Sequence, residues 1–432
     1  MSALTDRIAE DFASAARALP GRGHAAARRR TALEALAASG LPSSRDENWK
    51  YTNLRSLERA RFIPAPPGET PPPLGDLPAA IPAIARYVFV DGRFAPAASA
   101  APEPAGAVTR MAQPTAAAHA SDAVPAAHAD ERFALLNQAF ATDGLVIDVA
   151  ETRATPLQLE VLFIASAEAQ NGASYPRLEV RLHPDTQLTL IERHLSATAE
   201  GSFVASAVQV DLARGARLEH YRLQELSARS TLFDTLSARL AEGAAYRLHA
   251  ISTGGQSARS TLALRLMGER ADLSLAVAAL GDRQQVQDVY AVVEHAAANA
   301  RTVQTFRGIA AARARVAFNG KIIVAPGAHG TDSRQSLRGL LAGPEAEIDV
   351  RPQLEIYNDD VRCSHGATAG KLDDDMLFYL LSRGLPRETA QRLLKWAFLE
   401  DVIAQITLRP LRRQIEERLA GHLRDDALRE LL

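Results

Sequence analysis

Cysteine and lysine are scarce in this 432-residue chain, and aromatic residues make up only 5% of it. The single cysteine, Cys363, excludes an internal disulfide framework, so a reducing compartment is the simplest setting and we expect a cytoplasmic protein. The N-terminus carries Asp6, Glu10 and Asp11 and lacks the uninterrupted apolar stretch of a secretory signal peptide. Apolar runs also fall short of the roughly 18 residues that a membrane span needs.

An excess of charge of one sign is missing as well. The 49 Lys+Arg residues nearly balance the 51 Asp+Glu residues, which gives a formal net charge of −2. Nearly all of the positive charge is arginine, and the arginines are scattered along the chain. The sequence therefore lacks the basic patch of a nucleic-acid-binding protein and the polybasic run that binds anionic membranes. Hydrophobic residues make up 47%, enough for a large buried core.

Residues 1–143 form the first of three expected regions. Apolar residues at helical spacing predict helices before and after Pro20. A stretch rich in proline and alanine follows and predicts an extended linker. Inside it, Tyr87–Phe94 predicts a short hairpin that turns at Asp91-Gly92.

Residues 144–370 form the second region, in which short alternating segments end near Gly, Asn or Asp. The same sequence pattern recurs: a strand, a turn of small residues and a second strand, with no helical pattern between repeats. The turn-like positions recur at a nearly regular spacing, at Gly215, Gly243, Gly268, Asn299 and Gly327. Such a period predicts a parallel β-helix whose stacked coils share one core. A β-sandwich is the alternative, which the repeating phrase disfavours.

Residues 371–432 are predicted to be helical again. Asp373–Asp375 place acidic side chains at a helix N-terminus, Gly384 suits the end of that helix, and Pro410 separates a last helix that reaches Leu432. This helical unit is too small to form a core of its own. We therefore expect it to pack against another surface.

Asn358–Gly366 holds the one constellation with distinctive chemistry. If Leu354–His365 ends a strand, Cys363 and His365 lie two residues apart and project to the same face. A thiolate beside an imidazole is a ligand pair suited to iron or zinc. A buried cysteine next to a turn histidine explains the same residues equally well.

Two ligands do not complete a tetrahedral metal site. His329, Asp359 or Asp360 could contribute, or another protein could. The chain carries no other metal motif, so an incomplete ligand set predicts a site that is completed at an interface.

The sequence has no complete nucleotide-binding or hydrolase motif. Gly366–Leu372 imitates a phosphate-binding loop, but it is one residue short and has Leu372 where Ser or Thr would hold magnesium. We interpret it as a turn leading into a helix. The Gly-x-Ser-x-Gly and His-Glu-x-x-His motifs are absent. These observations predict a protein that is not an enzyme and has no ATPase of its own.

Four motifs give the sequence a specific resemblance to a known family. Leu354–Gly370 strongly resembles a signature of the SufB/SufD family of iron–sulfur cluster assembly scaffolds. Phe378–Leu385, Thr331–Gln335 and Glu47–Thr52 are similar to further family motifs. The SufB branch typically has Glu-His-Glu-Ala-Thr where this chain has Cys363–Thr368, so the resemblance is to the SufD branch.

The resemblance implies a right-handed parallel β-helix core flanked by N-terminal and C-terminal α-helical domains. It also implies two partners in a SufBCD-type complex: a SufB-like paralogue that forms a heterodimer and a SufC-like ABC-type ATPase. An iron–sulfur cluster would be assembled at the interface with the paralogue, with His365 and Cys363 at that site. The implied ATPase-docking residues lie in the C-terminal helices: Tyr379, Arg383, Gly384, Leu385 and Trp396.

Several alternatives stay open on the sequence. Flavin binding by the complex and a homodimer of the isolated chain are two of them. The alternative function is a β-solenoid carbohydrate-active enzyme or acyltransferase, in which carboxylates or a histidine would line a groove. A structural adaptor without any metal role is a third class.

Overall fold

The computed structural model describes residues 3–21, 23–43, 45–66, 77–100, 107–112 and 130–423. Parts of the expected Pro/Ala-rich linker, and the end of the expected last helix at Leu432, lie outside the described residues.

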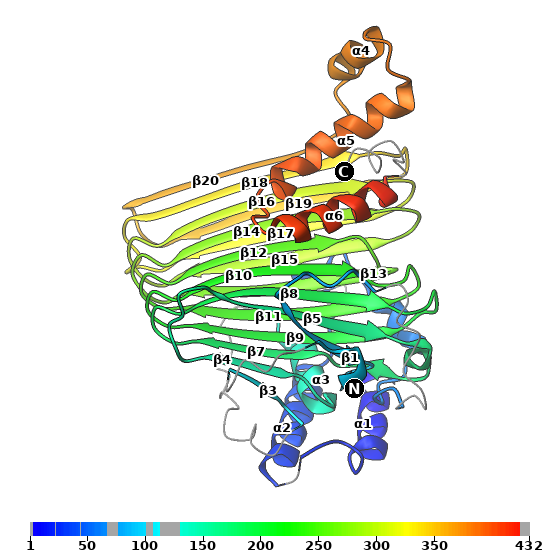
Figure 1. Ribbon diagram of the computed structural model, residues 1–432, viewed down its shortest axis with the longest axis vertical. Coiled ribbons are helices and arrows are strands. Elements are labelled where there is room, and N and C mark those ends of the chain that lie inside the picture. The colour runs from blue at the N-terminus through cyan, green and yellow to red at the C-terminus, as the bar shows by residue number, and fades with distance from the viewer. Residues whose placement is uncertain are drawn as a thin grey trace.

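The core is a parallel β-solenoid whose strands alternate between two sheets, with helices at the N-terminal and C-terminal ends of the chain (Figure 1). Successive strands within each sheet pair in parallel, whereas the β1–β2 and β3–β4 pairs are antiparallel. This confirms the predicted mainly-β solenoid and excludes a sandwich of two antiparallel sheets. The predicted hairpin is β1–β2, which turns through positive φ angles at Asp91 (49°) and Gly92 (74°).

The helices and strands have the following bounds. The α-helices at the N-terminal side are α1 (Ala3–Ala15), α2 (His24–Ser39) and α3 (Arg132–Phe140), and those at the C-terminal side are α4 (Asp374–Ser382), α5 (Arg387–Ile403) and α6 (Arg409–His422). Sheet B runs in the order β2 (Arg93–Phe94), β1 (Ala85–Val90), β5 (Leu157–Ala165), β8 (Gln187–Ser196), β10 (Arg217–Glu225), β12 (Ala245–Ser252), β14 (Asp272–Gly281), β16 (Arg301–Ala310), β18 (Thr331–Leu341), β20 (Val361–Gly370). Sheet A runs in the order β19 (Glu347–Ile356), β17 (Arg315–Val324), β15 (Val286–His295), β13 (Ser257–Leu266), β11 (Thr231–Leu240), β9 (Phe203–Leu212), β7 (Arg177–Leu182), β4 (Leu145–Val149), β3 (Val108–Arg110), with β6 (Ala173–Ser174) beside β9.

Each coil stacks its apolar residues on those of the coil before it. In sheet A, for example, Leu236 of β11 pairs in register with Leu262 of β13, and Leu240 pairs with Leu266. Because every second residue of a strand faces inward, these registers form continuous apolar columns between the sheets. The interior is therefore one core shared by all coils.

In the coils from β7 to β18, the turn from sheet A to sheet B contains a residue in the left-handed region. The backbone N–H of this residue donates to a carbonyl oxygen of the next coil, so the turns also form a ladder. The left-handed residues of successive coils are Asp185, Gly215, Gly243, Arg270, Asn299 and Gly330.

Gly268 and Gly327 lie in the bends and turns between strands, as predicted, but they are not the left-handed residues of their coils. The left-handed residues are Arg270 and Gly330 in place of Gly268 and Gly327. Gly268 is required for another reason, because a Cβ there would clash with the backbone of Glu242. Spacing alone could not separate a glycine that allows close approach from one that allows positive φ.

The helices cover the outer faces of the two sheets. The N-terminal helices and Trp49 pack with Phe203 and Phe233 on the outer face of sheet A. The C-terminal helices α5 and α6 bury residues such as Leu399 and Ile415 against Tyr221 and other apolar residues of sheet B. The terminal helical unit thus packs against the solenoid, as its small size requires. None of the described helices is long and apolar enough to cross a membrane.

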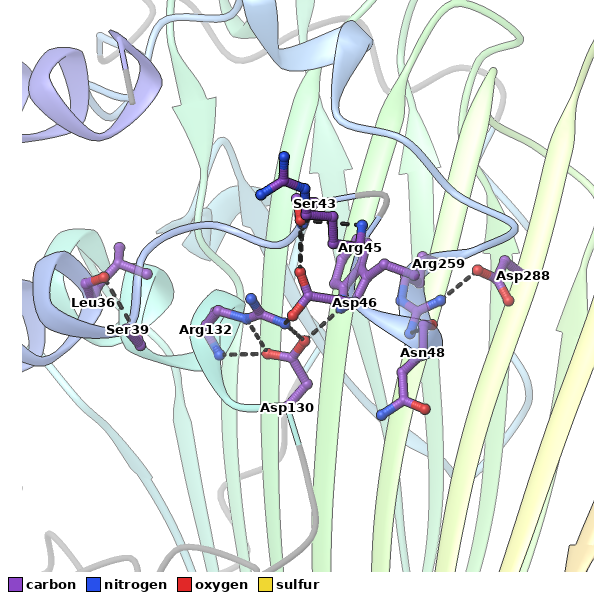
Figure 2. A network of polar contacts seen from close by, with 11 residues as sticks. Leu36, Ser39, Ser43, Arg45, Asp46, Asn48, Asp130, Arg132, Arg259 and Asp288 are labelled. Atoms are coloured by element: carbon purple, nitrogen blue, oxygen red, sulfur yellow. Dashed lines mark hydrogen bonds and ion pairs between the residues drawn. The ribbon is translucent and has the colours of Figure 1, made fainter. Parts of the chain in front are cut away.

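Arg259 of β13 fastens the Glu47–Thr52 motif to sheet A (Figure 2). Its guanidinium lies 4.1 Å from the ring centroid of Trp49, donates to the Asn48 carbonyl oxygen at 2.7 Å and forms an ion pair with Asp288. Thr52 Oγ1 donates to the same carboxylate at 2.6 Å. The arginine and Asp288 are both almost fully buried, so the motif acts as a structural anchor.

Replacement of Arg259 by Met is expected to lower the free energy of unfolding by about 3–5 kcal/mol, because it leaves the Asp288 carboxylate buried without its charged partner. The matched control is Arg229→Met, whose exposed ion pair with Glu200 should contribute no more than about 1 kcal/mol. Urea denaturation of the two variants measures the difference. Equal losses would contradict the anchoring role of Arg259.

The solenoid ends in an uncovered coil. β19 and β20 are the last strands of sheets A and B, and no other described strand pairs with their free edges. Residues of both strands are half-buried or exposed, whereas the equivalent inward residues one coil earlier, such as Phe318 and Leu337, are fully buried. The expected turn at Gly366–Leu372 is wrong for its first part, because Gly366–Gly370 completes β20.

Candidate functional site

Cys363 and His365 both lie on β20, at the uncovered end of the solenoid. The strand begins at Val361, so the motif starts a strand instead of ending the one that contains Leu354. Cys363 pairs in register with Ser333, and His365 with Gln335. Ser333 and Gln335 are buried, which places Cys363 and His365 on the face of sheet B that lines the solenoid interior.

The two side chains differ in their surroundings. Cys363 is half-buried and packs against the apolar core, whereas His365 is exposed. Burial, together with the carboxylate of Asp332, raises the pKa of the Cys363 thiol, and a backbone hydrogen bond with Ser333 opposes this shift. The thiol must therefore lose a proton at some cost before it can bind a metal ion.

The structure does not place the other candidate ligands beside Cys363 and His365. His329 and Asp360 lie in the turn ladder, where their carbonyl oxygens accept from Asn299 and Gly330. His365 is five residues beyond Asp360, or about 16 Å along an extended strand. Among the described residues, no group of three His, Cys, Asp or Glu side chains is arranged to hold a metal ion. Cys363 and His365 therefore share one face of β20 without a third such side chain arranged beside them among the described residues.

A second candidate surface lies on the C-terminal helices. Helix α4 projects beyond the sheets and packs on α5 (Figure 1). Tyr379 is 57% exposed, and the Arg383 guanidinium lies 5.2 Å from its ring centroid. Gly384 is exposed with a φ of 86°, and Leu385 is half-buried. Trp396 is set apart, because it packs against the cluster between α5 and sheet B.

The sequence reasoning missed the two most exposed apolar residues of α4. Phe378 is 71% exposed and Met376 is 59% exposed, while Leu377 between them is buried. The signal was present, since Met376–Leu381 is an unbroken apolar run that covers every side of a short helix. A helix that is apolar all round has to be covered by something.

The reasoning also missed a charged network inside the early coils. Glu192 accepts from His194 at 2.7 Å, from His220 at 3.1 Å and from Arg222 at 2.8 Å, and Arg222 also binds Asp234. Although burial raises the pKa of Glu192, Arg222 and these hydrogen bonds hold it well below its usual range. β12, β14, β16 and β18 separate this network from β20. We interpret it as a closed ion-pair network of the core.

Alkylation of the single cysteine by iodoacetamide is expected to report the raised thiol pKa directly. Only the thiolate reacts, so the midpoint of the pH–rate profile in the folded chain should lie above the ~8.5 of free cysteine. Asp332→Asn should lower the midpoint because it removes a nearby negative charge. The urea-denatured chain is the control, and a folded-state midpoint at or below the control would contradict this account.

Comparison with known proteins places this solenoid in a family. Residues 163–398 match the family described as "SUF system FeS cluster assembly, SufBD core domain". The chain is 32% identical over 393 residues to the iron–sulfur cluster assembly protein SufD of Escherichia coli, and the alignment covers 90% of this chain and 91% of that protein. It is 27% identical over 406 residues to a SufBD family iron–sulfur cluster assembly protein of Synechocystis, covering 90% and 89%.

The chain therefore belongs to the SufBD family of iron–sulfur cluster assembly proteins. Within that family it is SufD-like, which confirms the resemblance inferred from the motifs.

Proposed function

We propose that this protein is a non-catalytic, cytoplasmic scaffold of a SufBCD-type complex that assembles iron–sulfur clusters. It pairs with a SufB-like paralogue through the uncovered coil, β19 and β20, and binds a SufC-like ATPase through α4 and the start of α5. The cluster is the cargo of the complex. His365 and Cys363 contribute ligands to it at the interface, and the paralogue supplies the rest.

The uncovered coil carries this proposal. Free strand edges pair readily with other chains, and the inward-facing Ile348, Val350 and Leu354 are only partly buried there. A solenoid coil of another chain would cover this end with matching strands and apolar side chains. Cys363 and His365 would then lie between the two chains, where ligands from the partner can complete the coordination.

The ATPase surface rests on a separate observation. Helix α4 exposes the apolar side chains of Met376, Phe378 and Tyr379. The acidic residues Asp373 and Asp374 lie at the N-terminal end of this helix. Aromatic and Met residues with a nearby Arg383 are typical of a protein interface. The division of the chain into residues 1–143, 144–370 and 371–432 remains part of the proposal, with the last unit acting as the docking domain.

An enzyme of the carbohydrate-active or acyltransferase class fits less well. Two cavities formed by described residues have volumes of about 10 Å³ each, and one of them lies between α6 and sheet B. Each has room for about one water molecule, whereas small-molecule sites usually enclose about 300–1,000 Å³. Flavin binding stays a prediction from the resemblance alone.

Co-expression of the chain with a SufB-like paralogue and a SufC-like ATPase tests the proposal. We expect one complex that contains all three chains on size-exclusion chromatography, and iron and sulfide after reconstitution of that complex. A chain that binds neither partner, or that hydrolyses a glycoside or transfers an acyl group alone, would overturn it.

A further inference from the structure

Polar side chains line the solenoid interior directly behind His365. Gln335 of β18 pairs in register with His365 on one side and with Gln304 of β16 on the other. The next residue of this column, Leu275 of β14, is apolar. Behind His365, the polar column thus consists of Gln335 and Gln304, and its near end faces the uncovered coil.

The orientation of the Gln335 amide is fixed by its partners. Its Nε2 donates to the Gly320 carbonyl oxygen at 3.1 Å and to Gln304 Oε1 at 3.3 Å. A carbonyl oxygen can only accept, so the amide nitrogen must face Gly320 and the amide oxygen must face away from it. That oxygen, Gln335 Oε1, is buried and has no hydrogen-bond partner among the described residues.

An unpaired buried carbonyl oxygen normally costs about 1–3 kcal/mol, so such atoms usually have a partner. Gln335 has two neighbours by register. Gln304 turns its Oε1 toward Gln335 Nε2, and its own Nε2 makes no hydrogen bond within the described part of the chain. His365 is the neighbour on the open side, and its backbone lies one strand spacing, about 4.8 Å, from that of Gln335. Both side chains leave the same face of sheet B. The imidazole is exposed, so it has open space in which to turn a ring N–H toward Oε1.

We propose that Gln335 is a positioning residue for His365. Its Oε1 accepts one ring N–H of the imidazole and so selects one tautomer, which leaves the other ring nitrogen unprotonated and directed out of the uncovered coil. In histidines that bind metal ions, the N–H of the other ring nitrogen commonly donates a hydrogen bond to a carbonyl or carboxylate oxygen in this way. The consequence for cluster binding rests on the proposed function, whereas the choice of tautomer does not.

The first test is ¹⁵N NMR of the full chain labelled at histidine, without added metal and in mildly alkaline buffer. The His365 signals are identified by their loss in His365→Gln. We expect a single tautomer in the wild type and a mixture of tautomers in Gln335→Met, which keeps the side-chain volume but removes the acceptor. Gln335→Glu keeps an acceptor and should restore one tautomer.

Gln304→Met is the control, since it removes an amide from the same column one coil further from His365 but leaves the Gly320 carbonyl oxygen, which still orients the Gln335 amide. It should leave the His365 tautomer unchanged. The same tautomer mixture in wild type and Gln335→Met, or an equal effect of Gln304→Met, would overturn the inference. If Gln335→Met does not fold, loss of the single tautomer in the folded Gln335→Glu chain would overturn it instead.

A second readout separates this inference from the proposed function. On the assembled complex, Gln335→Met should weaken iron retention by roughly 10–100-fold and Gln335→Glu by much less. Wild-type iron content in His365→Ala would overturn the proposed function but not the tautomer result. If the His365 tautomer does not depend on Gln335, the inference is overturned, even if His365 is essential for iron binding by the complex.

Discussion

Replacing Phe378 by Asp is expected to weaken ATPase binding by at least about 30-fold, with no change in the stability of the chain. Phe378 is 71% exposed on α4, so the substitution removes no internal contact that the fold needs. Aromatic residues at the centre of an interface typically contribute about 2 kcal/mol or more to binding, and a buried carboxylate adds a further penalty. A loss of about 2 kcal/mol corresponds to about 30-fold in Kd.

The matched control is Met267→Asp. Met267 is also an exposed apolar residue, at 46%, but it follows β13 and does not belong to α4 or α5. Isothermal titration of the ATPase into each variant should show the loss only for Phe378→Asp. Full affinity in Phe378→Asp, or equal losses in both variants, would contradict a docking surface on α4.

A point substitution is a sharper test than removal of the C-terminal helices. Leu399, Val402 and Ile403 of α5 and Leu411 of α6 are fully buried in the cluster that covers the outer face of sheet B. Truncation before α4 would expose this face, and a chain that aggregates for that reason would say nothing about docking. Helix α4 itself contributes Leu377 as its only buried residue.

The solenoid could be predicted from sequence because its signal repeats. Segments such as Val208–Leu212 and Leu262–Leu266 alternate in the strand period, and each lies in a strand of the structure. The helix limits near Asp373 and Gly384 were also predicted, since an acidic N-cap and a positive-φ glycine leave local signatures.

The features that could not be predicted depend on contacts between distant residues. The Gly366–Gly370 segment resembles a turn by composition, yet pairing with β18 makes it a strand. The buried network joins Glu192 and His194 of β8 to His220 and Arg222 of β10 and, through Arg222, to Asp234 of β11; no local sequence pattern links these three strands. Gln335 stands behind His365 only because β18 and β20 are neighbours in sheet B, although a full coil of sequence separates the two residues.

The sequence predicted Cys363 and His365 as a pair, but not their unequal exposure. Strand alternation alone places both side chains on one face. The packing of Cys363 against Ser333 and the core, and the exposure of His365, follow from where the solenoid ends. This difference makes His365 the stronger candidate ligand, because it can reach a group at the interface without first losing a buried proton.

His365→Ala is accordingly expected to lower the iron and sulfide bound per complex by about tenfold or more, since loss of a ligand should cost at least as much as loss of a residue that supports one. Partner binding should be unaffected, because His365 contributes a single exposed side chain to the proposed interface. Cys363→Ala should have the same effect more weakly, because the half-buried thiol has a raised pKa.

The most direct test of the account is the iron and sulfide content of the assembled three-protein complex, wild type against His365→Ala, at equal amounts of assembled protein. The account predicts a loss of both elements in the variant, while the ratio of the three chains stays the same. Unchanged iron and sulfide, with unchanged delivery to an acceptor protein, would contradict a cluster site at the uncovered end of the solenoid.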